Sequence, residues 1–350
     1  MLSVTIDTAV FAPPPLGADP AVVRTFVTTL LEWREAVKGK ILEVYTSAHA
    51  PDLLGNCDLY PMRPHLKQLL QEAGAFEYDA NTIAVVAQTL LSTARIEDVL
   101  GISDVLVEDL TLNPDCFAAH SPAALRDYAE RCAVALSLAG TYFEEPQLRC
   151  HALALGSNPQ GSPVQIRGMI VELDHTRHDL GALPRQPSYF EGHVSICGSV
   201  HRFLLALDEA NVLRWASNAG EISTAVKVAL YKKRASDGIT TAWDQLPVFE
   251  VGCGFFDSLQ AHHVDSGSEL APKLLRAVVE TVFHENLAAT HALRKGPGPN
   301  EDQRMRGKDA AWRRDVDYEY HLHYWERASG IVELGSVGTH NDFSIPECAS

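Results

Sequence analysis

The stretch that decides the fold of the C-terminal part is RMRGKDAAWRRDVDYEYHLHYWERASGIVELGSVGTHNDFSIP, residues Arg304–Pro346. Apolar and polar residues alternate along Tyr318–Glu326 and again along Ile331–Thr339, and Arg327–Gly330 lies between them as a turn. This alternation is typical of strands, so the stretch predicts a β-meander. A fold needs only the apolar half of such strands. The other half here carries arginines, histidines and carboxylates, which bind phosphate and transfer protons.

Two histidines of this stretch share one face of the predicted second strand. His321 and His323 are two residues apart, and side chains at that spacing point to the same side of a strand. Leu322 lies between them and points to the opposite, apolar face. Two histidines beside an arginine cluster indicate an active site. The alternative is a solvated sheet face with salt bridges among four residues, namely Arg313, Arg314, Asp315 and Asp317.

The order of these residues resembles the toxins of the RelE/ParE superfamily, especially the YoeB-like ribonucleases. Those proteins carry a W-x-R-R-I segment, an H-R-L-x-Y strand, a short hairpin, and a closing strand ending in His and an aromatic or polar residue. The matching segments here are Trp312–Val316, Tyr320–Tyr324, Ser329–Gly330 and His340–Phe343. The resemblance implies two helices packed on a twisted antiparallel sheet. It places the opening strand at Val248–Leu259, the helical part at Glu269–Phe283 and the lead into the second strand at His291–Arg294.

The chain departs from the superfamily pattern in three places. Asp315 follows the arginine pair, His321 and His323 replace a basic and an apolar residue, and a Pro-Gly loop is inserted at Gly296–Pro299. These departures lie among the residues that would carry the chemistry, so they bear on activity and on substrate.

The resemblance implies RNA cleavage without a metal ion or other cofactor. That reaction needs a base for the ribose 2′-hydroxyl, cations for the pentavalent phosphate, and an acid for the leaving 5′-oxygen. The predicted catalytic residues are His340, His323, Glu319 and Arg314. The predicted nucleic-acid-binding residues are Arg304, Arg306, Lys308 and Arg313. The expected setting is a bacterial toxin or anti-phage defence system, with RNA, free or ribosome-bound, as substrate and proteins of a defence operon as partners.

Charge is unevenly placed along the chain. The 350 residues carry a formal net charge of −16, which argues against nucleic-acid binding over the whole surface. Arg294–Arg314, however, holds seven Lys or Arg and only three Asp or Glu. A local basic segment in an acidic protein indicates a phosphate site that the acidic N-terminal body restrains or targets. The alternative is a solvated loop of mixed charge.

Length and hydrophobic content, 46%, fit a globular protein of more than one domain. We expect a mixed α/β domain over residues 1–190, a helical connecting region over 191–245 and the RelE/ParE-like domain over 246–350. Strands are expected at Val4–Phe11, Ile41–Thr46, His151–Leu155, Val164–Leu173 and Gly192–Cys197. Helices are expected from Pro20 to about Lys38 and over Pro64–Ala73, Asn81–Leu91, Leu125–Ala139, Val200–Ala216 and Glu221–Lys233. Gly181–Pro187 is the expected joint.

A rival hypothesis is a metal-dependent nuclease that uses N-terminal carboxylates. Asp7 lies on the first expected strand and Asp104 and Asp109 follow, a layout that resembles PIN-type nucleases, which gather carboxylates around Mg or Mn. A second polar group contains Asp174, His175 and His178, and such ligands suit Mn or Zn. The structural alternatives are a strand-end Asp that caps a loop and a polar strand exit. A further rival is a non-enzymatic nucleic-acid-binding subunit of a defence complex.

Other classes lack their motifs. No P-loop, G-x-G-x-x-G or G-x-S-x-G occurs, so nucleotide hydrolysis, dinucleotide binding and serine hydrolysis are unsupported. The seven cysteines are scattered without a C-x-x-C pair, so neither a disulfide framework nor a zinc knuckle is expected. Cys253, between two glycines, has no identifiable partner for nucleophilic chemistry. No signal peptide or membrane span is expected either, and a reducing cytoplasm is the expected location.

Overall fold

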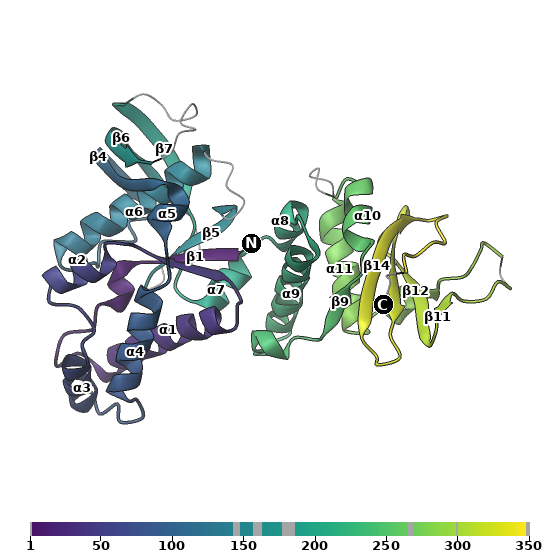
Figure 1. Ribbon diagram of the computed structural model, residues 1–350, viewed down its shortest axis with the longest axis horizontal. Helices are drawn as coiled ribbons and strands as arrows, with labels where there is room; N and C mark the ends of the chain where they lie inside the picture. Colours follow the sequence, from purple (N-terminus) through teal and green to yellow (C-terminus); the bar gives the residue numbers. More distant parts are fainter. Residues whose placement is uncertain are drawn as a thin grey trace. The chain divides into compact units, whose positions relative to one another are not determined.

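The chain divides into two compact units, Met1–Ala206 and Leu207–Ser350 (Figure 1). The computed structural model describes residues 2–142, 148–156, 163–176, 186–264, 269–298 and 300–347. The sequence predicted boundaries near residues 190 and 245, whereas the helices between those positions are divided between the two units. The expected joint at Gly181–Pro187 falls largely outside the described residues.

A parallel five-stranded sheet forms the centre of the N-terminal unit. Its order is β3 (Ala94–Arg95), β2 (Glu43–Thr46), β1 (Leu2–Ile6), β5 (Cys150–Ala154) and β8 (Ile196–Cys197). Every residue of β1 is buried, as expected for a strand covered on both faces. The expected strand Val4–Phe11 ends early, because a 3-10 helix, η1 (Thr8–Phe11), follows β1.

Helices surround this sheet, and two of them begin at a capping aspartate. Asp19 accepts a hydrogen bond from Ala21 N at the start of α1, and Asp79 accepts one from Thr82 N at the start of α4. Both expected helices are confirmed. The helices of the unit are α1 (Pro20–Lys38), α2 (Ala50–Asn56), α3 (Arg63–Glu72), α4 (Ala80–Leu91), α5 (Ile96–Leu100), α6 (Ala123–Tyr142) and α7 (Val200–Ala206).

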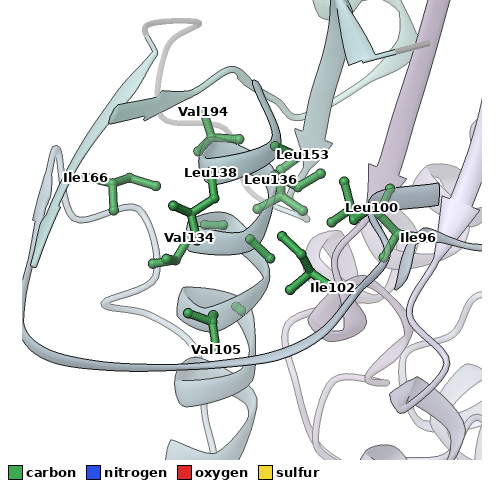
Figure 2. Packing of buried hydrophobic residues seen from close by; sticks show 14 of the residues in the cluster. Ile96, Leu100, Ile102, Val105, Val134, Leu136, Leu138, Leu153, Ile166 and Val194 are labelled. Carbon is green, nitrogen blue, oxygen red and sulfur yellow. The ribbon is translucent and has the colours of Figure 1, made fainter. Parts of the chain in front are cut away.

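A separate antiparallel sheet, β4 (Ile102–Asn113), β6 (Val164–His175) and β7 (Ser188–Val194), packs against α6. Figure 2 shows Val134 and Leu138 of α6 within the same core as Ile166 of β6. The sequence predicted β6 but missed β4. The pairing of β4 with β6 is interrupted by three register shifts, and much of β4 is exposed, so its sequence shows little alternation.

The C-terminal unit contains the predicted meander. The sheet order is β10 (Thr290–Ala292), β12 (Asp309–Asp315), β13 (Tyr320–Glu326), β14 (Val332–Thr339) and β9 (Phe249–Val251), and β11 (Met305–Arg306) pairs with β12. All neighbours are antiparallel except β14 and β9. The helices are α8 (Glu209–Trp215), α9 (Ala219–Ser236), α10 (Phe255–Ala261) and α11 (Leu270–Val282), with short 3-10 turns η4 (Trp243–Gln245) and η5 (Leu287–Ala289). The prediction of a mixed α/β protein with a C-terminal sheet is confirmed.

Two expected elements of this region are corrected. The long opening strand Val248–Leu259 is wrong: β9 ends at Val251, and α10 follows. Gly252 lies too close to β14 for a side chain, because a Cβ there would be 2.7 Å from Leu334 O. The single helix Val200–Ala216 is also wrong, because Asp208 caps a new helix by accepting bonds from two backbone N–H groups.

Within the described ranges, no helix combines the length and the apolar character needed to cross a bilayer.

Candidate active site

Strand pairing brings five polar residues to one face of the C-terminal sheet. His291 of β10 is opposite Arg313 of β12, Arg313 is opposite His323 of β13, and Asp315 is opposite His321. Residues directly opposite in an antiparallel pair lie on the same face of the sheet. We call these five residues (His291, Arg313, Asp315, His321, His323) the histidine face.

The other face of the sheet belongs to the core of the unit. Leu322 is opposite Val337 of β14, both are buried, and α11 packs against β12, β13 and β14. β13 is therefore buried on both sides, including its two histidines: His321 is 2% exposed and His323 is not exposed at all. Such burial is costly for polar groups unless hydrogen bonds compensate for the lost water.

Each buried histidine has one ring nitrogen hydrogen-bonded. His321 Nε2 lies 2.9 Å from Asp315 Oδ1. His323 Nδ1 lies 2.8 Å from the carbonyl oxygen of Ser344, which can only accept, so Nδ1 carries the proton. Burial lowers the pKa of His323 to about 4. Burial, followed by the nearby Arg313 guanidinium, also lowers the pKa of His321. Both rings are therefore neutral near pH 7.

The remaining ring nitrogens, His321 Nδ1 and His323 Nε2, are buried and have no hydrogen-bond partner within the described part of the chain. The His321 ring also contacts His340, with 4.9 Å between ring centroids. A neutral imidazole with one nitrogen held and the other free has an available lone pair, which is the form a proton-accepting group needs.

A C-terminal strap, residues Asp342–Pro346, covers part of this face. Its backbone carbonyls accept from His323 Nδ1 and, at 3.1 Å, from Trp325 Nε1. Ile345 completes a small apolar cluster with Leu293, Ala311 and Trp325. The strap fits because β14 lacks side chains beneath it: a Cβ on Gly335 would be 2.7 Å from Ile345 Cδ1.

Beside the histidine face lies an open, polar pocket of about 640 Å³. The guanidinium carbon of Arg313 lies 5.6 Å from the centre of the Phe343 ring on its wall. None of the described residues that line it is Asp or Glu. The lining residues are Thr290, His291, Ala292, Arg294, Gly296, Pro297, Gly298, Arg313, His340, Asn341 and Phe343. Arginines and histidines without carboxylates suit an anionic ligand, phosphate above all.

The structure brings some of the predicted residues together. His340 and Arg313 line the pocket, and Arg313 Nη1 donates to His340 O at 3.5 Å. His323 lies on the same face but under the strap. Glu319 is exposed, and its backbone carbonyl accepts from His340 N at 2.9 Å.

Other predicted residues lie elsewhere. Arg314 is 1% exposed on the core face and donates to Glu280 Oε2 at 2.8 Å and to Glu285 O at 2.6 Å. Arg306 pairs with Glu333 and Asp309, and these carboxylates raise its pKa further. The guanidinium of each is thus already neutralised by a carboxylate within the unit.

The last two predicted cations, Arg304 and Lys308, do not line the pocket. Arg304 donates to Lys295 O at 3.5 Å, and Lys308 is exposed in the turn between β11 and β12. The pocket instead contains His291, Arg294 and Asn341, which the sequence did not single out. The resemblance placed His291 and Arg294 only in the lead into a strand and Asn341 only in the closing segment, and Arg294 also begins the basic segment.

Two of the predicted N-terminal carboxylates, Asp7 and Asp104, pair with other side chains. Asp7 lies at the carboxyl end of β1 and pairs with His120 Nε2 at 2.5 Å. Asp104 pairs with Arg131 at 2.8 Å, and Asp109 occupies an irregular position of β4 with φ of 51°.

Asp174 and His175 end β6, whereas His178 lies outside the described residues. In the described part, no three His, Cys, Asp or Glu residues are placed to hold a metal ion.

Cys253 is disulfide-bonded, a bond that the scattered cysteine spacing did not indicate. A cysteine in a disulfide has no thiolate, so it cannot act as a nucleophile in this state. Sequence spacing missed the bond because it depends on the distance between two residues in space, not along the chain.

No known protein family, no curated protein and no solved structure matches this chain.

Buried His323 predicts a pH-dependent stability. The folded-state pKa of about 4 lies below the unfolded value of about 6.5, so between these pH values the unfolded chain binds more protons. The free energy of unfolding should therefore decrease as pH falls through this window, by up to about 1.4 kcal/mol per pH unit from this residue. His323→Gln should flatten the decrease in urea titrations at pH 7, 6, 5 and 4.

His284→Asn is the matched control, because His284 is exposed and has a positive φ that asparagine tolerates. Curves for wild type and His323→Gln that stay parallel from pH 7 to pH 4 would contradict the assignment of a neutral, buried His323.

Proposed function

We propose that the C-terminal unit binds RNA in the pocket beside the histidine face and cleaves its backbone without a metal ion. The observation that carries the proposal is the pocket lining: two arginines, two histidines and, among the described lining residues, no carboxylate. This occurs in a chain whose formal net charge is −16. A cationic pocket in an acidic protein selects a strongly anionic ligand at one place, not over the whole surface.

The pocket offers the groups that cleavage of RNA requires. Arg313 and Arg294 present planar guanidinium groups that match the oxygens of a phosphate. His340 and His291 supply two groups able to move protons. One takes the proton of the 2′-hydroxyl as the 2′-oxygen attacks phosphorus. The other gives a proton to the 5′-oxygen as the P–O5′ bond breaks.

This assignment changes roles that the sequence alone had distributed. Arg313 replaces Arg314 as the phosphate ligand, because Arg314 is buried on the core face against Glu280. His291 replaces His323 and Glu319 as the partner of His340, because His323 is covered by the strap and Glu319 does not line the pocket. In each case, a residue that is buried, covered or outside the pocket gives way to one that lines the pocket.

The order of elements supports a RelE/ParE-like assignment of this unit. β9 is followed by α10 and α11 and then by the antiparallel strands β12, β13 and β14, with α11 packed on the sheet. Helices on an antiparallel sheet in this chain order are what the resemblance implies. We propose that the protein acts in a bacterial toxin or defence system, with RNA as substrate and other proteins of that system as partners.

Cleavage of total bacterial RNA and plasmid DNA by the full-length chain, with and without EDTA, tests the proposal. RNA cleavage should survive EDTA. His340→Ala and Arg313→Ala should each lower kcat/KM about 100-fold or more, because each removes a group acting on the transition state. Arg276→Ala, an exposed arginine on α11, is the control and should retain activity.

Three results would count against metal-independent RNA cleavage by the pocket. Cleavage abolished by EDTA and unaffected by Arg313→Ala would favour a metal-dependent nuclease based on the N-terminal carboxylates. RNA binding that Arg313→Ala weakens, without cleavage, would favour a non-enzymatic binding subunit. Cleavage of DNA alone would contradict the role given to the 2′-hydroxyl.

We also propose that the acidic N-terminal unit restrains the cationic pocket. The observation behind this proposal is the uneven distribution of charge: Arg294–Arg314 is net positive, whereas the whole chain has a formal net charge of −16. Removal of residues 1–206, the first compact unit, should raise the rate of RNA cleavage. The comparison requires a fragment shown to be folded by circular dichroism. Equal or slower cleavage by a folded fragment would contradict restraint.

A further inference from the structure

Asp315 contacts two imidazoles of the histidine face at once. Its Oδ1 lies 2.9 Å from Nε2 of the buried His321, and its Oδ2 lies 3.7 Å from Nε2 of His291. His291 is on the pocket wall, whereas His321 lies behind it and contacts His340. The Asp315 carboxylate thus reaches both histidines of the proposed reaction. It pairs with His291 directly and reaches His340 through the buried His321 ring.

The contact with Asp315 fixes the tautomer of His321. A carboxylate accepts, so Nε2 of the neutral ring carries the proton and donates it to Asp315. Nδ1 is left as a bare lone pair, and it has no partner in the described residues although it is buried. A carboxylate that orients an imidazole and leaves its second nitrogen free is the arrangement that supports general bases in hydrolytic triads.

His340 makes two contacts that place its ring beside that of His321. Its backbone N donates to Glu319 O at 2.9 Å, and its ring lies 4.9 Å from that of His321 at an angle of 39°. The groups around His321 are Arg313 and Asp315 on β12, His323 on β13, and His340 after β14. The β14 residue opposite His321 is Gly338, which brings no side chain. Asp315 is therefore the anion paired with this ring, and Arg313 opposes it.

We infer that Asp315 and His321 are positioning residues that hold His340 and His291 in place and stabilise their charged forms. The inference rests on the proposed function of the pocket. When His340 takes the 2′-hydroxyl proton, the neutral His321 ring and the carboxylate behind it support the imidazolium that forms. The other oxygen of Asp315 pairs with His291 whenever that ring is protonated, as a proton donor must be.

Two substitutions test the charge of Asp315 and the presence of the His321 ring separately. Asp315→Asn retains an oxygen that accepts from His321 Nε2 but removes the negative charge. His321→Gln removes the ring between Asp315 and His340. Each should lower kcat about tenfold or more with little change in KM, whereas Arg313→Ala should raise KM as well. Asp302→Asn, an exposed carboxylate on the neighbouring hairpin, is the control.

The pH dependence gives a readout that a merely structural role would not produce. Loss of the carboxylate makes an imidazolium less stable, so the limb of the kcat profile that reports histidine protonation should move to lower pH in Asp315→Asn. The profile of Asp302→Asn should coincide with that of wild type. A profile that does not move in Asp315→Asn would overturn the inference.

A second measurement needs no RNA. The pH titrations of His340 and His291 can be followed by NMR of the ring protons in the full-length chain, assigned with His340→Ala and His291→Ala. Asp315→Asn should lower both midpoints, and His321→Gln should lower that of His340. Unmoved midpoints in folded variants would overturn the inference even if RNA is cleaved. Lowered midpoints in a chain that cleaves no RNA would uphold the positioning pair and overturn the proposed function instead.

Discussion

The antiparallel register of β12 with β10 and β13 is the constraint on which the candidate site depends. It places Arg313 between His291 and His323, and Asp315 opposite His321. A shift of β12 by one residue would turn Arg313 and Asp315 toward the core and bring Arg314 to the pocket side. The ion pair of Arg314 with Glu280 on the core face opposes such a shift, since a buried guanidinium would lose its partner. Fold and site are thus specified by the same pairing.

The histidine face combines burial with exposure. At one end, Trp325 and Ile345 of the strap belong to one apolar cluster; at the other, His340 and Arg313 line the pocket. His321 lies between these ends. Its burial lowers its pKa, so the ring is neutral near pH 7, and it still contacts the His340 ring. Burial lowers the pKa of both His321 and His323, and acid–base chemistry uses pKa values that the environment has shifted.

Sequence patterns predicted much of the fold and part of the site. Alternation located β13 and β14, and the expected helices at Pro20 and Asn81 match α1 and α4, because the signals for these elements are local. Local signals could not show that Arg313 and not Arg314 faces the pocket, since that depends on the pairing partner. β10 is only three residues long, so His291 carried no strand pattern. The partners of the strap could not be read from local patterns, because its contacts with His323 and Trp325 join residues 21 positions apart.

The most direct test of the central claim, that the pocket beside the histidine face binds RNA, is hydrogen–deuterium exchange of the full-length chain with and without a single-stranded 2′-O-methyl RNA. That RNA cannot be cleaved through its 2′-oxygen, so binding is measured apart from chemistry. The account predicts slower exchange in peptides covering Thr290–Gly298 and His340–Phe343, which line the pocket. Slower exchange confined to the N-terminal unit, around Asp7 and the ends of the parallel strands, would contradict it.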